Sequence, residues 1–138
     1  DHNENSIAFL NETKEKENLN ISTALYDINA ANIQENYDFI VSTVVFMFLN
    51  RERVPSIIKN MQEHTNVGGY NLIVAAISTD DVPCPLPFSF TFPENELKEY
   101  YKDWEFLEYN ENIGELHKTD ENGNRIKMKF ATMLARKK

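Results

Sequence analysis

The chain has 138 residues, of which 41% are hydrophobic, and it carries a formal net charge of −8 with a sequence pI near 4.9. This length supports one domain with its own core and leaves little material for a second. The acidic balance would repel a phosphate backbone, and no basic stripe with interleaved aromatic residues offsets it, so we expect no nucleic-acid partner.

Cysteine content and hydropathy exclude further classes of protein. Cys84 is the only cysteine, which rules out an internal disulfide and a metal centre built on thiolates. The longest apolar run, residues 39–49, is shorter than the roughly 20 residues that a membrane helix needs. No signal-peptide pattern is present. We therefore expect a cytoplasmic protein with no membrane contact and no metal.

The first elements of the chain are predicted as a helix and a strand. Residues 5–18 contain apolar side chains at helical spacing, and Asp1 or Asn3 is a suitable N-cap. Residues 20–28 are rich in β-branched and aromatic types and end at the turn former Asp27, which predicts a strand.

The middle of the chain has the pattern of a βαβ unit. Residues 37–45 form a continuous apolar run, typical of a strand covered on both faces in a parallel sheet. Residues 51–65 predict a helix that stops at Gly68-Gly69, followed by a second buried strand over residues 70–77. The apolar positions of this helix recur at spacings of three and four: Val54, Ile57, Ile58 and Met61.

A proline-rich loop separates this unit from the end of the chain. Residues 78–95 hold four of the five prolines, which prevents them from forming a central strand. Phe88, Phe90 and Phe92 alternate with hydroxyl residues there, either as a lid over a site or as an aromatic patch that closes the core. A short helix is predicted at residues 94–104.

The last two predicted strands, residues 105–116 and 126–136, form a hairpin. A two-residue Asn122-Gly123 turn would place Leu116 opposite Lys129 and mix the two faces. A three-residue turn places Leu116 opposite Phe130, and we prefer this register because it separates the faces. The apolar face would then hold Leu116, Ile126, Met128 and Phe130, and the polar face would hold His117, Thr119, Arg125 and Lys127.

The direction of this hairpin decides where its tip lies. If its first strand runs parallel to the earlier strands, the Asn-Gly tip lies at their carboxyl edge, where open α/β sheets bind ligands. The alternative is a solvated hairpin whose charges serve solubility.

Three stretches resemble one enzyme family: "YDFIVSTVVFMFL", "GGYNLIVAA" and "GELHKTDENGNRIKMKFATMLARKK" are similar to the tellurite-resistance methyltransferases of the TehB type. The resemblance implies an α/β, Rossmann-like class I sheet, mostly parallel, with an antiparallel C-terminal hairpin strand. It makes residues 1–138 a single domain that uses S-adenosyl-L-methionine. The family's first strand and glycine-rich loop would precede Asp1. We therefore expect the chain to need that N-terminal segment, or strand exchange in a homodimer, to fold well.

The same resemblance implies the cofactor-binding residues. Asp1 would hold the ribose hydroxyls with His2 and Asn3 beside the adenosine, and Asp27 would accept from the adenine amino group with Ile28 against the ring. Ser42, Thr43 and Val44 would line the cofactor and the methyl-transfer channel. The residue types alone also permit plainer roles, namely a helix cap, a turn residue and a strand terminus.

Methyl transfer to tellurite or selenite would require orientation and positive charge rather than a general base, because the central atom carries its own lone pair. Arg125 and His117 are the predicted catalytic residues, and Lys118 ranks below them. Two alternatives stay open. One is methylation of a small organic thiol or carboxylate. The other is a non-catalytic binding fragment, because the glycine-rich loop is absent.

Overall fold

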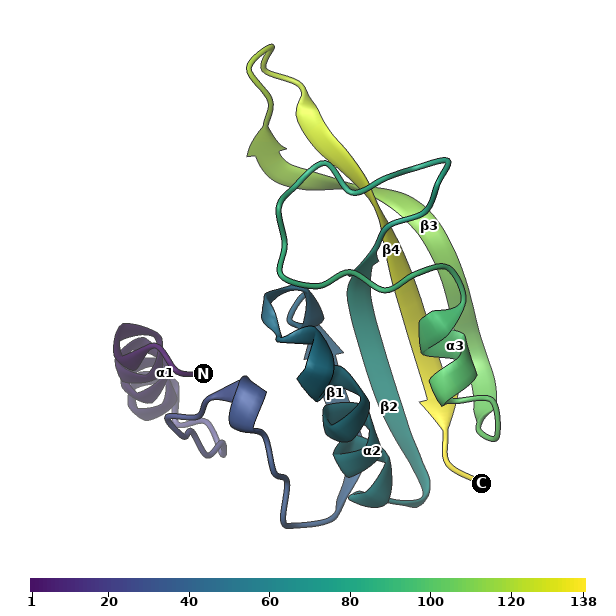
Figure 1. Ribbon diagram of the computed structural model, residues 1–138. Coiled ribbons are helices and arrows are strands. Elements are labelled where there is room, and N and C mark those ends of the chain that lie inside the picture. Colours follow the sequence, from purple (N-terminus) through teal and green to yellow (C-terminus); the bar gives the residue numbers. More distant parts are fainter. The chain divides into compact units, whose positions relative to one another are not determined.

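The structure is a computed structural model that describes residues 1–138. The chain divides into two compact units, residues 1–32 and 33–138, and each is described by itself (Figure 1). None of the helices combines the length and apolar character that a bilayer crossing requires.

The first unit is built around helix α1, Glu4–Glu17. Asn3 is its N-cap, and the Asn3 side-chain oxygen accepts a hydrogen bond from the Ser6 N–H at 3.1 Å. The helix ends at Asn18, which adopts a left-handed conformation with φ 52°. Both the predicted helix and one of its two predicted caps are confirmed.

The predicted strand at residues 20–28 is wrong. Residues 19–27 have no regular secondary structure, and a short 3-10 helix, η1 (Ile28–Ala30), follows. The backbone of Asp1 makes hydrogen bonds to the residues on both sides of Leu25. The Asp1 nitrogen donates to Ala24 O at 3.4 Å, and Asp1 O accepts from the Tyr26 N–H at 2.8 Å. The two hydrogen bonds have the pattern of a parallel pairing, and α1 begins three residues later at Glu4.

The second unit contains a four-stranded mixed sheet in the order β1-β2-β4-β3. The strands are β1 (Tyr37–Thr43), β2 (Thr65–Ile77), β3 (Glu105–Thr119) and β4 (Arg125–Arg136). β1 is parallel to β2, whereas β4 is antiparallel to both β2 and β3. β3 therefore runs in the same direction as β1 and β2, which confirms the mostly parallel α/β sheet with an antiparallel C-terminal strand.

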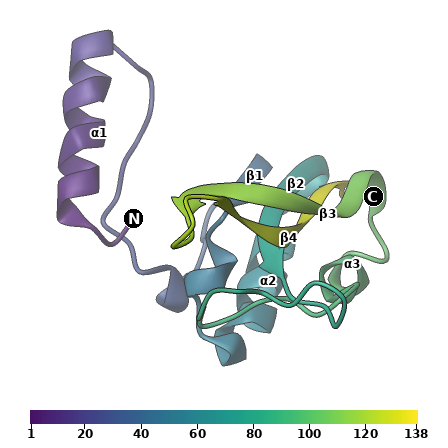
Figure 2. The ribbon, with the colours of Figure 1, turned by 90° about the horizontal axis from the view of Figure 1, so that it is seen from above.

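Helices α2 (Val54–Glu63) and α3 (Glu96–Tyr100) lie on the same side of the sheet (Figure 2). Two 3-10 turns, Phe46–Phe48 and Arg51–Arg53, lead from β1 into α2. All four predicted apolar positions of α2 are buried, which confirms the helix. They lie against the buried part of β2, in which Ile73, Ala75 and Ile77 are 0% exposed.

A chain of polar side chains crosses this core. The Tyr101 hydroxyl donates to Asn71 Oδ1 at 2.8 Å, Asn71 Nδ2 donates to Thr65 Oγ1 at 2.7 Å, and Thr65 Oγ1 donates to Met61 O at 2.7 Å. No buried side-chain polar atom lacks a hydrogen-bond partner. The burial of Tyr101 raises the pKa of its hydroxyl, so that it stays a neutral donor.

Two expectations about the middle of the chain are wrong in detail. β1 is not covered on both faces, because Phe39 and Val41 are 50% and 51% exposed at the edge of the sheet. Gly68 and Gly69 do not stop the helix, which ends at Glu63; they lie inside β2. A Cβ on Gly69 would come within 2.7 Å of Asp38 O, so the close approach of two backbones requires glycine there.

The hairpin register also differs from the prediction. Gly114 pairs with Met128 and Glu115 with Lys127, and after a shift Thr119 pairs with Arg125. The predicted opposition of Leu116 and Phe130 is therefore wrong. The shift leaves the apolar grouping largely intact, because Leu116 and Phe130 still pack in one cluster with buried Met128.

Candidate functional site

The carboxyl ends of β1, β2 and β3 share one edge of the sheet, and the β3–β4 ribbon projects beyond it (Figure 1). β2 pairs with β4 only as far as Ile77 opposite Lys129, so residues 114–128 continue as a two-stranded ribbon. We call residues 114–128 the ribbon tip. Its place at the carboxyl edge agrees with the expectation from sequence.

Asp120 shapes the turn of the ribbon tip. Its Oδ1 accepts from the N–H groups of Asn122 and Asn124 at 2.9 and 3.0 Å, and its own N–H donates to Asn124 O at 2.8 Å. Gly123 supplies the positive φ of 80° that the turn requires. The turn thus spans residues 120–124 and is longer than the three residues predicted.

Arg125 closes a bulge in β3. Residues 116–118 of β3 stand opposite the single residue Ile126 of β4, which leaves backbone groups of β3 without ladder partners. Arg125 Nε donates to Leu116 O at 2.7 Å, and Nη2 donates to Glu115 O at 3.3 Å. Nη1 lies 3.5 Å from Glu115 Oε2. The predicted catalytic cation is therefore anchored to its own ribbon.

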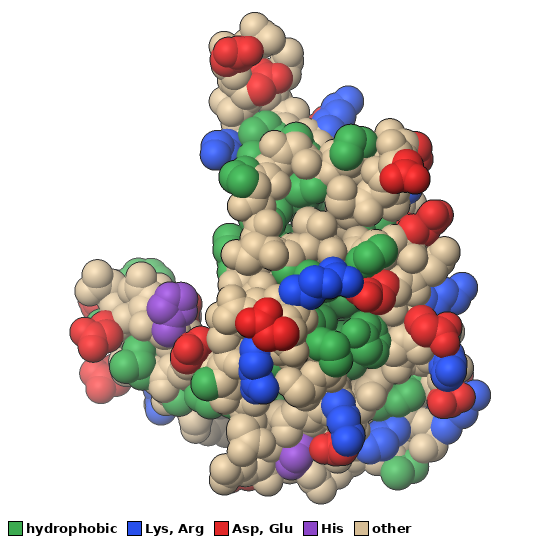
Figure 3. Space-filling view, viewed as in Figure 1, with side chains coloured by type: hydrophobic (Ala, Val, Ile, Leu, Met, Phe, Trp, Pro, Cys, Tyr) green, Lys and Arg blue, Asp and Glu red, His purple; other side chains and the backbone are tan.

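A hollow of about 740 Å³ opens between the ribbon tip and the proline-rich loop, within the range of about 300–1,000 Å³ typical of ligand pockets. Besides turn residues 123 and 124, it is lined by Pro85, Glu115, Asp120, Arg125, Ile126 and Lys127. We call it the ribbon hollow. Figure 3 shows acidic side chains at the end of the projecting ribbon and basic side chains just below them.

His117 lies within the bulge and does not line the ribbon hollow. Its side chain is exposed and makes no hydrogen bond or ion pair, as is also true of Lys118. The structure thus brings Arg125 into the hollow and leaves His117 beside it, in contact with solvent.

Ser42 and Thr43 end β1 at the same carboxyl edge, and Val44 follows directly. Val44 has φ 58°, a left-handed conformation that a β-branched residue rarely adopts, and its N–H donates to Val74 O at 2.8 Å. Strain of this kind costs about 1–3 kcal/mol and is concentrated at functional sites. The backbone thus turns sharply where the cofactor channel was expected.

The carboxyl end of β1 lies far from Arg125 along the strand direction. Val74 pairs with Thr132, which is seven residues beyond Arg125 along β4. A straight strand of seven residues spans roughly 20–25 Å. A ligand held by both Val44 and Arg125 therefore requires the ribbon to bend over the edge, and a bulge such as that at residues 116–118 bends a strand.

The proline-rich loop serves the core and also lines the hollow. Phe90 and Phe92 are 4% and 0% exposed, and Phe92 forms an isolated bridge with Ile77, as expected of an aromatic patch. Phe88 instead packs edge-on against the exposed ring of Phe48, with 5.7 Å between centroids. Cys84 is partly buried in the cluster around Met128 and is not placed for nucleophilic chemistry.

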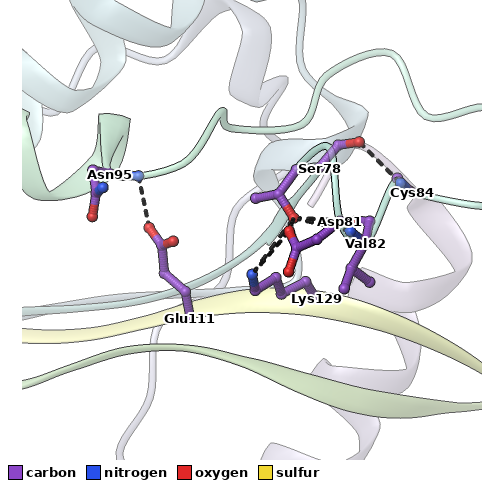
Figure 4. A network of polar contacts seen from close by, with 8 residues as sticks. Ser78, Asp81, Val82, Cys84, Asn95, Glu111 and Lys129 are labelled. Atoms are coloured by element: carbon purple, nitrogen blue, oxygen red, sulfur yellow. Dashed lines mark hydrogen bonds and ion pairs between the residues drawn. The ribbon is translucent and has the colours of Figure 1, made fainter.

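A polar network fixes the start of this loop to β4 (Figure 4). Lys129 reaches Asp81 at 3.7 Å and Thr79 Oγ1 at 3.5 Å, and Thr79 Oγ1 donates to Asp81 at 2.6 Å. The hydrogen bond from Thr79 and the charge of Lys129 hold the pKa of the Asp81 carboxyl below its usual value. The network sets the path of the chain toward Pro85.

The predicted cofactor residues of the first unit lie close together within that unit. The backbone pairing of Asp1 with Tyr26 puts Asp1 beside Asp27. Each carboxylate caps its own turn through Oδ1, Asp1 to the Asn3 N–H and Asp27 to the Asn29 N–H, both at 2.9 Å. Their Oδ2 atoms make no hydrogen bond. His2 is exposed, and its Nδ1 lies 3.8 Å from Asp1.

Three residues that line the ribbon hollow were not predicted from the sequence: Glu115, Asp120 and Pro85. Asp120 lies two residues before Asn122-Gly123, a spacing typical of an Asx turn, so this signal was present. Glu115 and Pro85 carry no comparable signal, because their position depends on the bulge and on the path of the loop.

A family model described as "Tellurite resistance protein TehB" matches residues 1–134. A protein of Haemophilus influenzae (strain 10810) named "Probable S-adenosyl-L-methionine-dependent methyltransferase TehB" is 98% identical over 138 residues. The alignment covers 100% of this chain and 48% of that protein, so the chain spans about half the length of this curated relative.

Solved structures extend the comparison. The crystal structure of TehB from Haemophilus influenzae is similar with a TM-score of 0.98 and 97% identity, covering 100% of this chain and 48% of that one. The N-methyltransferase NodS from Bradyrhizobium japonicum WM9 has a TM-score of 0.66 at 15% identity, over 100% of this chain and 71% of its own. The second likeness concerns the fold alone and identifies it as Rossmann-like.

Proposed function

This chain belongs to the TehB family, and we propose that it is part of a cytoplasmic methyltransferase that transfers a methyl group from S-adenosyl-L-methionine to oxyanions of the tellurite and selenite type. The observation that carries the proposal is the match of the family model to residues 1–134. The mixed sheet and the ribbon hollow at its carboxyl edge support it.

The residues expected to hold the cofactor have the donor set that it needs. Asp1 and Asp27 each keep one carboxylate oxygen free after capping their turns, so Asp1 can accept from ribose hydroxyls and Asp27 from an adenine amino group. Ile28, next to Asp27, provides apolar surface for the ring. His2 and Asn3 lie beside Asp1, and Ser42, Thr43 and Val44 form the strand end of the second unit.

The chemistry needs little from the protein besides placement and charge. When bound, the cofactor supplies a methyl group on a positively charged sulfur. A tellurite or selenite ion offers a lone pair on its central atom, so no general base is required. Arg125 compensates the charge of the anion and orients it, and His117 serves as a second donor.

The ribbon must bring these groups to the strand ends. Because Arg125 lies well beyond Val44 along the strand direction, we propose that the ribbon tip bends over the carboxyl edge during the reaction. The same closure would exclude water from the site. A double electron–electron resonance distance between spin labels at Glu121 and Glu35 should shorten on addition of cofactor product and selenite.

Transfer of labelled methyl groups to tellurite tests the function in the full-length protein. Arg125→Ala and His117→Ala should each lower kcat/KM by about 10²–10³-fold, the usual loss on removing one such donor. The exposed cation Lys59 on α2, which pairs only with Glu63, gives a control that should behave as wild type. Unchanged turnover in both site variants would contradict the assigned roles.

A further inference from the structure

Three charged side chains of the ribbon hollow share one face of the ribbon. Arg125 and Lys127 are two residues apart on β4, so they point to the same side of the strand. Glu115 on β3 pairs directly with Lys127, which places it on that side as well. All three line the ribbon hollow.

The hydrogen bonds of Arg125 leave part of its guanidinium available. A guanidinium carries five N–H donors. Nε and one N–H of Nη2 are used by the carbonyls of Leu116 and Glu115, so the side of the fork that faces the bulge is occupied. The remaining donors are on Nη1 and on the second N–H of Nη2. An acidic oxygen already lies near them, Glu115 Oε2 at 3.5 Å from Nη1.

Glu115 is paired with the more distant of its two possible cations in the ladder. Lys127 is its direct cross-strand neighbour, yet the Glu115 carboxylate pairs with Arg125. Lys127 is exposed and makes no hydrogen bond or ion pair with any residue of the chain. The hollow therefore contains one unpaired cation, and beside it a second cation that is only loosely held by a carboxylate.

We propose that Arg125 and Lys127 form a two-cation site for a small oxyanion, and that Glu115 is an internal competitor which the anion displaces from Arg125. The identity of the anion, a selenite-like or tellurite-like ion, rests on the proposed function. The Glu115 carboxylate resembles such an anion in charge and in its oxygen acceptors, so it occupies Arg125 when no acceptor is bound. Displacement costs little, because an exposed ion pair contributes at most about 1 kcal/mol.

Calorimetric titration of the full-length protein, loaded with S-adenosylhomocysteine, with sodium selenite tests this site independently of methyl transfer. Glu115→Gln should tighten selenite binding about two- to fivefold, and Lys127→Gln should weaken it by a similar factor, the scale of an exposed ion pair. Glu121→Gln removes the same charge from the turn outside the hollow lining, and Lys59→Gln removes a cation from α2. Both control variants should bind selenite as the wild type does.

The outcomes separate the two proposals. If Glu115→Gln leaves selenite affinity unchanged or weakens it, or if Glu121→Gln tightens binding equally, the competitor role is overturned. Absence of selenite binding in the wild type overturns the site as a whole. If the variants bind selenite as expected but the wild type transfers no methyl group, the anion site stands and the proposed function fails. If the wild type methylates selenite but neither variant changes selenite affinity, the proposed function stands and the two-cation site with its Glu115 competitor fails.

Discussion

The sheet body, formed by the paired parts of β2 and β4 with α2 and α3, differs from the ribbon tip in what holds it together. In the body, Ile73, Ile77 and Met133 are fully buried. In the tip, beyond the apolar cluster around Met128, the side chains that fix the backbone are polar: Arg125 across the bulge and Asp120 within the turn. Stability is therefore concentrated in the body, while the groups proposed to bind an anion lie where substitutions perturb folding least.

Polar contacts also differ between the two regions. The hydrogen bonds that join Tyr101, Asn71 and Thr65 are enclosed by the core, so the loss of one partner leaves a buried group unsatisfied. The hydrogen bonds of Arg125 are accessible to water, which replaces them when they break. A substitution that removes a hydrogen bond in the body should therefore lower the free energy of unfolding several times more than one in the tip.

The largest effect is expected for Ile73→Ala in the sheet body. Removing a fully buried side chain leaves a cavity, and the free energy of unfolding should fall by about 2–5 kcal/mol. Ile113→Ala, at a position 57% exposed on β3, should change it by less than about 0.5 kcal/mol. Urea unfolding followed by circular dichroism measures both. Equal losses would remove the distinction between body and surface.

Tyr101→Phe should have the second largest effect on stability, because it deprives buried Asn71 Oδ1 of its hydrogen-bond donor. We expect a loss of about 1–3 kcal/mol in the free energy of unfolding. Tyr37→Phe, on the exposed edge strand, is the matched control and should be neutral. A neutral Tyr101→Phe variant would show that the polar chain adds nothing to the body.

Val44→Gly should raise the free energy of unfolding instead of lowering it. Glycine adopts the φ of 58° without strain, and after its larger entropy cost the variant should be more stable by about 1 kcal/mol. Val41→Gly, in the regular part of β1, should be less stable. Thermal unfolding compares them, and a destabilised Val44→Gly protein would argue against strain at this strand end.

Arg125→Ala should cost only about 0.5–1 kcal/mol, because water can hydrate the carbonyls that Arg125 now contacts. Hydrogen exchange of the ribbon-tip amides should accelerate, while that of β2 stays unchanged. A large loss of global stability on this substitution would show that the tip and the body are not separate.

The smallest effect is expected for the Lys129–Asp81 network. The pKa of Asp81 is lowered by its hydrogen bond from Thr79 and by Lys129, so its contribution is present above the ordinary carboxyl pKa and is lost only as pH falls through the lowered value. Exchange of the Val82 amide, corrected for intrinsic rate, should therefore be constant from about pH 5 to 8. Asp81→Asn should raise the exchange rate of this amide across that range. A corrected exchange rate that changes with pH between 5 and 8 in the wild type would contradict the lowered pKa of Asp81.

Apolar patterns predicted the body well. The spacing of Val54, Ile57, Ile58 and Met61 predicted α2, and the two apolar runs predicted the parallel pair β1 and β2, because burial against a sheet demands those periods. The exposure of β1 was missed, since a run of apolar residues shows what a strand can bury and not what covers it. Residues 20–28 show the same point. Their composition favours a strand, but it does not reveal whether a partner strand lies beside them.

The tip was predicted only in part. Alternation placed Leu116 and Phe130 with Met128, since any even shift of register keeps the faces. The bulge was not foreseen, because it depends on Arg125 folding back onto Leu116 O and on Asp120 closing a longer turn. Alternation also placed Lys127 on the same face as Arg125, whereas the ion pair between Glu115 and Arg125 was not foreseen, because it depends on that bulge.

The most direct test is a crystal structure of the full-length protein with S-adenosylhomocysteine and selenite, in which anomalous scattering locates selenium. We expect a selenium peak in the ribbon hollow within contact of Arg125 Nη1 and Lys127 Nζ, with Glu115 turned away from Arg125. A peak elsewhere, with the Arg125–Glu115 pair intact at its present 3.5 Å, would contradict it.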